Sequence, residues 1–396
     1  MSGGMSLISG VAWVPTGAWK EVPEPEDPDA VQESIRDLRL SEGDAAPTTM
    51  NDFEDGEDVW ENGLDSADDS DVENEMLKKN DLVCLTAHAA DEQSYSAVEV
   101  FVYDATTDGL YVHHDIVLEQ TPMCVTWVGT HHENSANLSA VGDVQGGVTL
   151  WNLDVRNVAC PVAWLGGRVG KKGKRLRPDS HTEAVLSIKW NIGASQYLAT
   201  ASADATIKLW DLVTDSCVQT RQRIHTDKVQ SIDWSVPEPF LLLSGGFDNT
   251  VRIHDCREGD RAIRVDLGAC PEQVSWLPTN DHMFVVSLTD GSLCNFDARK
   301  TGDGPLARLQ AHSANCVFSF NPHIPGLLAT GGEDKLIHLW DVRSGNAENI
   351  VTHNLGVGEV FGISFHPNQP EILAAGGSAD KLLVYTVSSD IAKAGF

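Results

Sequence analysis

The sequence predicts an all-β fold, a seven-bladed β-propeller, and the first observation is a repeated pair. An aromatic residue followed by Asp, or a worn version of that pair, occurs seven times. The pairs are Tyr103-Asp104, Trp151-Asn152, Trp210-Asp211, His254-Asp255, Phe296-Asp297, Trp340-Asp341 and Tyr385-Thr386. Successive gaps are 48, 59, 44, 42, 44 and 45 residues. A period of about 40 to 45 residues that closes on such a pair is typical of a propeller blade.

The second observation is a constant order of elements inside each repeat. In the third repeat a turn at His181 precedes an apolar strand from Val185 to Trp190, a small-residue strand from Tyr197, a tight turn at Asp204 and a strand ending at Trp210. Short strands bounded by turn residues are what an all-β array requires. The order recurs at His225–Asp255 and His312–Asp341, more weakly at Cys270–Asp297 and Val360–Tyr385, and in degenerate form at Cys124–Asn152.

The third observation is a set of four polar positions that repeats with the blades. The sets are His181, Thr200, Asp204 and Trp210; His312, Thr330, Asp334 and Trp340; and His225, Ser244 and Asp248 with His254 in place of Trp. They resemble the internal tetrad of WD-repeat proteins. A His, an Asp and a hydroxyl also compose a catalytic triad, but a catalytic set need occur only once. Buried polar groups that bond one another explain the repetition, so we expect a structural role.

The first blade lacks an innermost strand directly before its second strand at Leu82. A candidate lies upstream at residues 7–14, where Val11 and Trp13 share the spacing of the strand from Val229 to Trp234. We therefore expect residues 16–80 to be an insertion inside blade one, 81–387 the remainder of the propeller, and 388–396 a C-terminal tail. The alternative is an unstructured start with one stray Trp.

The expected insertion carries much of the net charge of −30. Residues 16–80 hold 21 acidic and 5 basic residues, and residues 42–75 hold 14 acidic residues and no basic one. Such composition does not bury enough apolar surface to offset the entropy of ordering, so we expect disorder and early proteolysis at 42–75. Ser66 and Ser70 match acidophilic kinase sites, and Val31–Leu40 has the spacing of a short helix. A solvated, inert segment is the alternative.

The loop at residues 165–178 is positively charged, although the protein as a whole is strongly negative. Its six cations are Arg168, Lys171, Lys172, Lys174, Arg175 and Arg177, and the loop contains no acidic residue. The loop accounts for the long 59-residue gap. Contact with RNA phosphates and a nuclear-import signal are both consistent with it, and a merely solvated loop is the alternative. Because it leads into an inner strand, we expect it on the face opposite the acidic insertion.

The sequence lacks several motifs that are typical of enzymes and metal sites. The eight cysteines show no C-x-x-C spacing, which disfavours zinc and dithiol sites. There is no Walker loop, dinucleotide fingerprint or H-E-x-x-H, and Gly166–Lys171 lacks the spacing of a phosphate loop. The sequence has no secretory signal and no run of 18 apolar residues, so we expect a soluble intracellular protein without cofactor or small-molecule substrate.

The order of several segments resembles one family, periodic tryptophan protein 1, over nearly the whole chain. The segments are Ala12–Pro15, the acidic stretch, Tyr111–Asp115, the residues before Trp127, the basic loop with His181–Ser187, Ala201–Asp211 and His225–Gln230. A generic WD motif does not supply Tyr111–Asp115 or the basic loop. The chain departs from the family in its shorter acidic segment, its shorter basic loop and an end soon after Tyr385.

The resemblance implies a nucleolar, non-catalytic assembly factor of the large (60S) ribosomal subunit. Its partners would be the pre-60S particle, pre-ribosomal RNA and other assembly factors, and outside the particle it would be monomeric. Two other functions fit a propeller: a chromatin reader linked to ribosomal-DNA transcription, and a substrate receptor of a cullin-type ubiquitin ligase. The second rests on Trp340-Asp341-Val342-Arg343, echoed at Asp255–Arg257 and Asp297–Arg299. A hydrolase is disfavoured.

Overall fold

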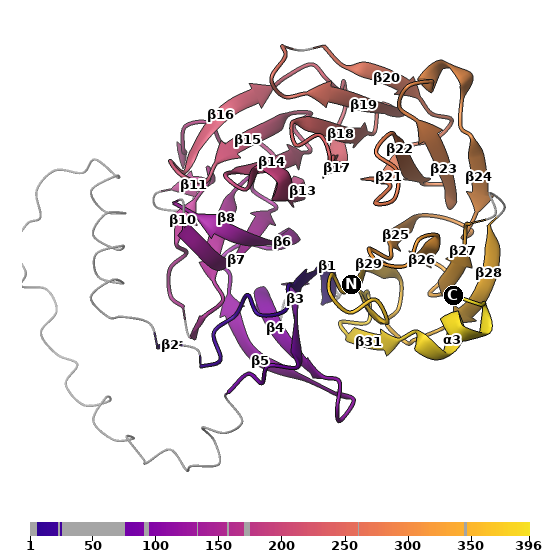
Figure 1. The fold of residues 1–396 in the computed structure, drawn as a ribbon. Coiled ribbons are helices and arrows are strands. Elements are labelled where there is room, and N and C mark those ends of the chain that lie inside the picture. Colours follow the sequence, from indigo (N-terminus) through magenta and orange to yellow (C-terminus); the bar gives the residue numbers. More distant parts are fainter. Residues whose placement is uncertain are drawn as a thin grey trace, which may run out of the picture.

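The chain folds into a seven-bladed β-propeller (Figure 1). The structure is a computed structural model that describes residues 6–22, 24–25, 76–90, 95–132, 134–156, 158–169, 175–259, 261–343 and 347–396. The expected insertion residues 26–75, with Ser66, Ser70 and the helical pattern Val31–Leu40, lie outside these ranges, and so do Lys171, Lys172 and Lys174.

The first three blades each contain four strands, named here from the centre outwards. Blade one has β1 (Leu7–Val14), β3 (Asp81–Ala89), β4 (Ala97–Asp104) and β5 (Gly109–Val117). Blade two has β6 (Pro122–His131), β7 (Asn134–Asp143), β8 (Val148–Asn152) and β10 (Ala163–Trp164). Blade three has β13 (Val185–Trp190), β14 (Tyr197–Ser202), β15 (Ile207–Asp211) and β16 (Ser216–Arg221).

The next three blades repeat this plan. Blade four has β17 (Val229–Trp234), β18 (Leu241–Gly246), β19 (Thr250–Asp255) and β20 (Ile263–Asp266). Blade five has β21 (Pro271–Trp276), β22 (Met283–Leu288), β23 (Ser292–Asp297) and β24 (Ala307–Gln310). Blade six has β25 (Cys316–Phe320), β26 (Leu327–Gly332), β27 (Ile337–Asp341) and β28 (Glu348–His353). In every blade adjacent strands pair antiparallel. The repeated aromatic–Asp pair, or its worn version, stands at the end of the third strand of each blade.

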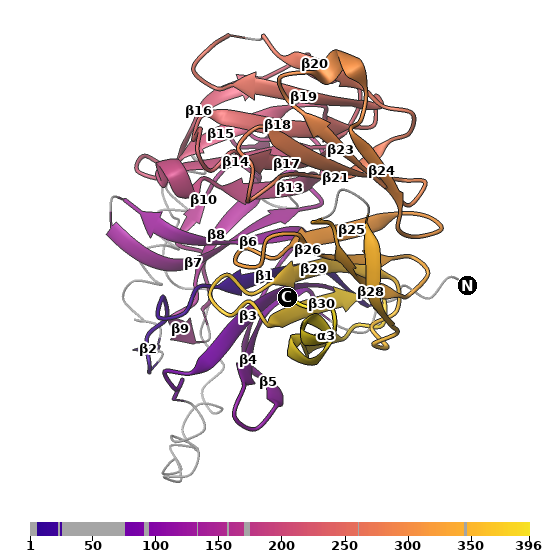
Figure 2. The same cartoon turned by 45° about the vertical axis from the view of Figure 1, so that its right-hand side comes forward.

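Blade seven has three strands in the described part of the chain: β29 (Val360–Phe365), β30 (Ile372–Gly377) and β31 (Leu382–Thr386). The tail expected at 388–396 is a short helix, α3 (Ser388–Lys393), which packs beside β28 (Figure 2). Ile391 is buried in the core of blades six and seven. The hydroxyl of Tyr385 donates to the carboxylate of Asp390, so the helix is fixed to the blade by a polar contact as well as an apolar one.

The innermost strands touch one another around the whole ring, and β1 closes it between β29 and β6. β1 pairs with β3 over Leu7–Val14, which is where the sequence predicts the first strand. Its Trp13 is 6% exposed and donates its indole N–H to the carbonyl oxygen of Ser364 in blade seven at 3.0 Å. On the other side, the Ser9 hydroxyl donates to the Pro122 carbonyl oxygen in blade two at 2.9 Å.

Two glycines of blade seven make room for β1. A Cβ atom on Gly362 would meet Val11 at 2.9 Å, and one on Gly376 would meet Ile8 at 2.8 Å. Larger residues at these positions would push the strand out of the ring, since such short contacts force a shift. The apolar cluster at this junction joins residues of both blades, including Ile8, Trp13 and Leu382.

Both described ends of the expected insertion 16–80 are attached to the propeller. Trp19 and Leu77 pack into the core of blades one and two. The Lys20 amide donates to the Asp154 carboxylate at 3.0 Å, and the Leu77 amide donates to the Glu21 carbonyl oxygen at 2.9 Å. The sequence did not show this, because an apolar residue within a charged run looks like part of that run.

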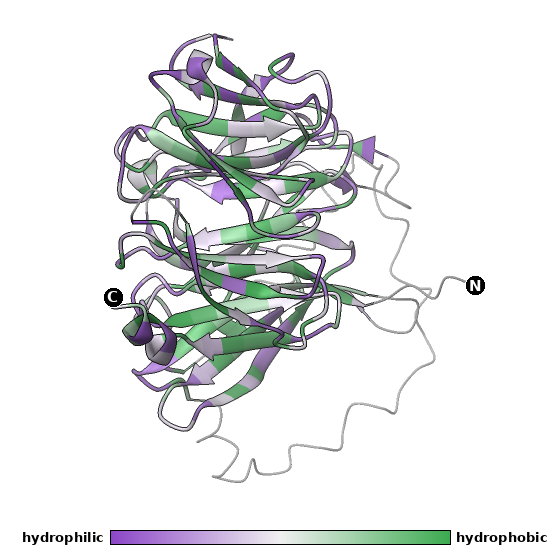
Figure 3. Ribbon diagram, turned by 90° about the vertical axis from the view of Figure 1, so that its right-hand side faces the viewer, coloured by the Kyte–Doolittle hydropathy of each residue, from purple (hydrophilic) through white to green (hydrophobic). Residues whose placement is uncertain are grey.

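Two small sheets and two single turns of 3-10 helix complete the described structure. The insertion contributes β2 (Glu24–Pro25), which pairs in parallel with β9 (Val155–Arg156). The basic loop forms a hairpin of β11 (Arg168–Val169) and β12 (Arg175–Leu176). The 3-10 turns are η1 (Ile192–Ala194) and η2 (Thr301–Asp303). Apolar residues concentrate along the strands and hydrophilic ones in the connections (Figure 3). Within the described residues no helix is long and apolar enough to span a membrane.

Trp13→Ala should destabilise the fold by about 3–5 kcal/mol, because it removes a buried indole at the ring junction. Trp13→Phe should cost less, with about 1 kcal/mol of that loss from the missing hydrogen bond to Ser364. Chemical denaturation measures both free energies of unfolding, with the exposed Val236→Ala as control. If Trp13→Ala unfolds at the wild-type denaturant concentration, the ring does not depend on this strand.

Candidate functional site

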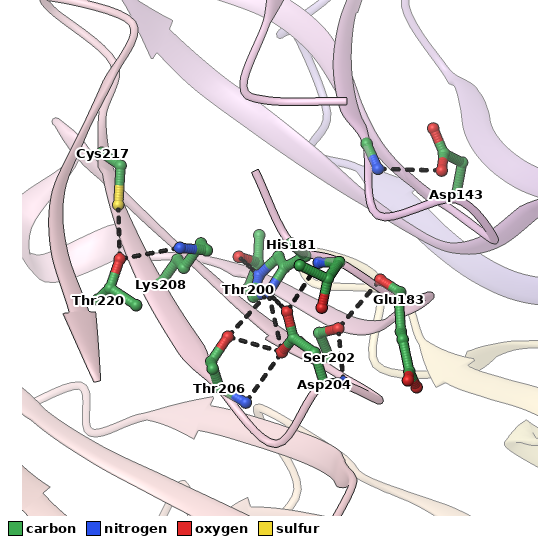
Figure 4. Close-up of polar contacts among 12 residues, drawn as sticks. Asp143, His181, Glu183, Thr200, Ser202, Asp204, Thr206, Lys208, Cys217 and Thr220 are labelled. Atoms are coloured by element: carbon green, nitrogen blue, oxygen red, sulfur yellow. Dashed lines mark hydrogen bonds and ion pairs between the residues drawn. The ribbon is translucent and has the colours of Figure 1, made fainter. Parts of the chain in front are cut away.

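The polar set of blade three is a continuous series of hydrogen bonds, and Figure 4 shows its members His181, Thr200 and Asp204. The Nδ1 atom of His181 lies 3.1 Å from Asp204 Oδ2, and its Nε2 atom lies 2.8 Å from Thr200 Oγ1. The Trp210 indole N–H donates to the same Thr200 oxygen at 2.9 Å. Because a carboxylate accepts only, Nδ1 carries the proton and Nε2 accepts from the hydroxyl.

In this geometry neither the imidazole of His181 nor the hydroxyl of Thr200 is accessible to a substrate. Thr200 and His181 are both fully buried, and the hydroxyl is engaged with two partners. Burial alone would raise the pKa of Asp204, but its hydrogen bonds and ion pairing with His181 hold that pKa well below its usual range. Burial also lowers the pKa of His181. Blade six repeats the chain with His312, Thr330, Asp334 and Trp340, with distances of 2.9, 2.8 and 3.0 Å along it.

Blade four has three of the four members. His225 lies 3.0 Å from Asp248 and 2.8 Å from the Ser244 hydroxyl. His254, which replaces the Trp, is 1% exposed, and neither ring nitrogen has a hydrogen-bond partner. Burial and the nearby Arg221 lower the pKa of His254 to about 3. The position therefore holds a neutral imidazole whose polar atoms are unsatisfied.

The basic hairpin leaves blade two and crosses toward blade three. It begins at Gly166 and Gly167, which have φ angles of 83° and 96°, a region that favours glycine. A Cβ atom on Gly166 would lie 3.0 Å from the backbone of Ser180. At the other end the Arg177 amide donates to the Gly167 carbonyl oxygen at 2.9 Å. The two ends are therefore held together, and Arg168 and Arg175 lie on the paired strands β11 and β12.

The described cations of this hairpin have different surroundings. Arg168 and Arg175 are exposed. Arg168 acts on Asp143, whose pKa is raised because burial outweighs the opposing effects of the backbone N–H donors and of this arginine. Arg177 is half-buried, with its guanidinium 5.2 Å from the centre of the Trp164 ring. Arg177 therefore anchors the hairpin as well as charging it, which the sequence did not reveal.

Beside the hairpin lies a shallow hollow that the sequence did not predict. Arg168 and Lys228 both line it, together with Glu183 and the turns at Gln145 and Thr182. Lys228 belongs to blade four and is exposed. It was missed because it is a lone lysine in a turn, and only the curvature of the ring brings it near blade two.

The hairpin and the described ends of the acidic insertion lie on opposite faces. The hairpin connects the outer strand β10 of blade two to the inner strand β13, on the face of the turn at Asp143. The insertion connects β1 to β3 and pairs with β9, which follows the third strand of blade two. Because neighbouring strands alternate in direction, these two kinds of connection open on opposite sides. We call them the hairpin face and the insertion face.

A central channel of about 930 Å³ runs between the innermost strands. Each innermost strand contributes at least one large aromatic residue to its lining: Trp13, Trp127, Trp190, Trp234, Trp276, Phe318 with Phe320, and Phe361 with Phe365. Trp127 and Trp190 contact edge to face at 5.2 Å between ring centres. Trp234 donates to the Lys189 carbonyl oxygen at 3.1 Å, which repeats in blade four the link that Trp13 makes to blade seven. These two hydrogen bonds connect neighbouring blades through their innermost strands.

The Asp-x-Arg motifs form local pairs. Arg257, Arg299 and Arg343 each donate from backbone and guanidinium to the Asp two residues earlier. The Arg343 guanidinium also lies 3.8 Å from the centre of the Phe396 ring and thereby holds the C-terminal segment. The arrangement is sufficient to explain arginine at these positions.

Comparison with known proteins shows which class of protein this propeller belongs to. The model of the WD domain, G-beta repeat, matches residues 173–211, 215–255 and 304–341. An uncharacterized WD repeat-containing protein of Schizosaccharomyces pombe is 36% identical over 386 residues, covering 94% of this chain and 72% of the yeast protein. The chain is thus a WD-repeat protein.

Two further relatives narrow the class. The periodic tryptophan protein 1 homolog of Drosophila melanogaster is 28% identical, covering 85% of this chain and 74% of the fly protein. Periodic tryptophan protein 1 of Saccharomyces cerevisiae is 30% identical, covering 80% of this chain, which spans 64% of that protein. The chain belongs to the periodic tryptophan protein 1 family, and the family resemblance predicted from the sequence is confirmed.

Asp204→Ala should cost about 1–3 kcal/mol of stability, because it leaves the buried His181 N–H and the Thr182 amide without their acceptor. The melting temperature measures this, with the exposed Asp227→Ala as control. Any loss of binding should follow the loss of folded protein. A variant that keeps its melting temperature and loses one specific activity would contradict the structural role.

The free energy of unfolding should fall as pH drops from about 6.5 to about 4.5. The pKa of His254 is lowered to about 3 and that of His366 to about 4, so the unfolded chain takes up protons that the folded chain does not. His254→Phe should reduce this slope by at most about 1.4 kcal/mol per pH unit. Denaturation at several pH values measures the slope, and exposed His282→Phe should leave it unchanged. An unaltered slope in His254→Phe would show that His254 is protonated in the fold.

Proposed function

We propose that this protein is a non-catalytic scaffold in the assembly of the large ribosomal subunit. Membership of the periodic tryptophan protein 1 family supports the proposal, because the resemblance of the sequence to that family implies a nucleolar assembly factor. Its binding partners are then pre-ribosomal RNA and other assembly factors of the pre-60S particle, and the protein works in the nucleolus.

The observation that best supports binding to pre-ribosomal RNA is the basic hairpin on a protein that is otherwise acidic. A net charge of −30 repels nucleic acid, so contact must be made where cations are gathered. The hairpin presents Arg168 and Arg175 to solvent, and Lys228 of blade four lies at its base. Arg177 packs its guanidinium over the Trp164 ring, which fixes the second strand of the hairpin to blade two.

The tetrads support a scaffold rather than an enzyme. Their hydroxyl and imidazole groups are buried and satisfied, so they stabilise the blades and are not presented to a substrate. What the ring offers to partners is its loops, since rigid blades position variable connections on two faces. The hairpin face bears the basic hairpin, and the insertion face bears the ends of the acidic segment.

Sedimentation of a cell extract tests the proposal. The protein should travel with pre-60S particles and should recover large-subunit precursor RNA after crosslinking. Migration with complexes the size of a cullin ligase, or exclusively with chromatin, would contradict the assembly role and support one of the two alternatives stated from the sequence.

Salt dependence tests the hairpin itself. If six cations met single-stranded phosphates, log K would fall with log salt at a slope of about −4, from about −0.7 per contact. Charge reversal of Lys172 and Arg175 to Glu should make the slope shallower by about 1.4. The matched control reverses the exposed Arg261 and the exposed Lys300, and should leave the slope unchanged.

A nuclear-import role of the hairpin is separated by a fusion. When a heterologous import signal is attached to the charge-reversed protein, its location should be restored while particle association stays reduced. Restoration of both would show that the hairpin acts in import alone. Equal RNA affinity of the reversed and control proteins at low salt would contradict phosphate contact.

A further inference from the structure

A cluster of two histidines and one aspartate lies on the insertion face, where blade two meets blade three. His131 ends β6, His132 follows it, and Asp215 stands in the turn between β15 and β16. One ligand atom from each residue lies within 4.8 Å of the other two. Neither the tetrads nor the basic hairpin uses any of these residues.

Both imidazoles point at the same carboxylate. His131 Nε2 lies 2.9 Å from Asp215 Oδ1, and His132 Nε2 lies 3.2 Å from Asp215 Oδ2. The two rings are tilted by 51° with their centres 3.8 Å apart. The His131 side chain is 8% exposed, Asp215 25% and His132 53%, so the cluster has a buried base and an open side.

The second ring nitrogen of His132 fixes its tautomer. Nδ1 lies 2.8 Å from the Val213 carbonyl oxygen, which accepts only, so Nδ1 must carry the proton. Its Nε2 atom lies 3.2 Å from Asp215 Oδ2, so this nitrogen and the Nε2 atom of His131 both face the same carboxylate.

A histidine that donates one ring N–H to a backbone carbonyl while the other nitrogen faces a carboxylate is oriented as metal-binding histidines are. Zinc binds imidazole nitrogen and carboxylate oxygen at about 2.0–2.2 Å, which in a tetrahedron places neighbouring ligand atoms about 3.3 Å apart. The observed separations of 2.9 and 3.2 Å are close to that spacing. The ligand atoms of the two histidines lie within 4.8 Å of each other.

The backbone of the cluster is set in an uncommon conformation. His132 has a φ angle of 45° and Asp215 one of 50°, both in the left-handed region. The His132 amide is tied to the Leu212 carbonyl oxygen of blade three at 3.0 Å. The two loops are thus held in register independently of the side chains, and the ligand atoms are pre-positioned.

We propose that His131, His132 and Asp215 form a binding site for a divalent transition-metal ion, with zinc as the best match. Two imidazoles select against magnesium and calcium, which prefer oxygen ligands. Three protein ligands leave one tetrahedral position on the open side, available to water or to a side chain of a bound partner. The ion would join the first connection of blade two to the outer connection of blade three.

Zinc binding to the metal-free, untagged full chain tests this site. Wild-type protein should bind one equivalent more than His132→Ala and Asp215→Asn, and zinc should raise the melting temperature of the wild type but not of these two variants. Because thiols also bind zinc, cobalt supplies a second readout: visible bands lost in the variants, without the charge-transfer band of a thiolate ligand. His282→Ala, which removes an exposed histidine elsewhere, is the matched control and should behave as wild type.

Equal zinc stoichiometry in wild type, Asp215→Asn and His132→Ala would overturn the proposal. So would a wild-type melting temperature that does not respond to zinc. Asp215→Asn keeps the shape of the side chain, and its melting temperature without metal shows that the variant is folded. None of these outcomes depends on ribosomal particles, so the test stands apart from the proposed function.

Discussion

The whole propeller depends on one strand that is separated from its own blade in sequence. β1 fills the gap between blades one and seven, and without it the inner strands do not form a ring. The fit is specific on both sides: Gly362 and Gly376 accommodate its apolar face, and the Trp13 indole bonds to Ser364. A large insertion is tolerated between β1 and β3 because the entropic cost of closing a loop grows only slowly with its length.

Buried polar groups and surface charges have separate roles in this molecule. The tetrads of blades three and six satisfy their own donors and acceptors, so they contribute to stability and to a unique packing of each blade. The described charged side chains of these connections are not part of the core, whereas the apolar Trp19 and Leu77 at the ends of the insertion pack into it. The charges can therefore differ in sign on the two faces without disturbing the ring, which is why a basic hairpin and an acidic insertion coexist on one platform.

The sequence predicted what repetition determines and missed what depends on contacts between blades. The blade count and β1 followed from repeated spacing, and the tetrad members followed from their resemblance to the internal tetrad of WD-repeat proteins. The attachment of Trp19, the packing of Arg177 on Trp164 and the nearness of Lys228 to the hairpin depend on which elements the ring brings together. The pairing of His131 and His132 with Asp215 was missed for the same reason, because 83 residues separate His132 from its partner.

The most direct test of the account is to cut the chain between β1 and β3. A site for a specific protease placed within residues 26–75 would separate the first strand from the rest of the polypeptide. The account predicts that the N-terminal fragment stays bound through gel filtration and that the melting temperature changes little, because β1 is held by strand pairing and packing. Release of that fragment from a ring that remains folded would contradict the claim that residues 7–14 close the propeller.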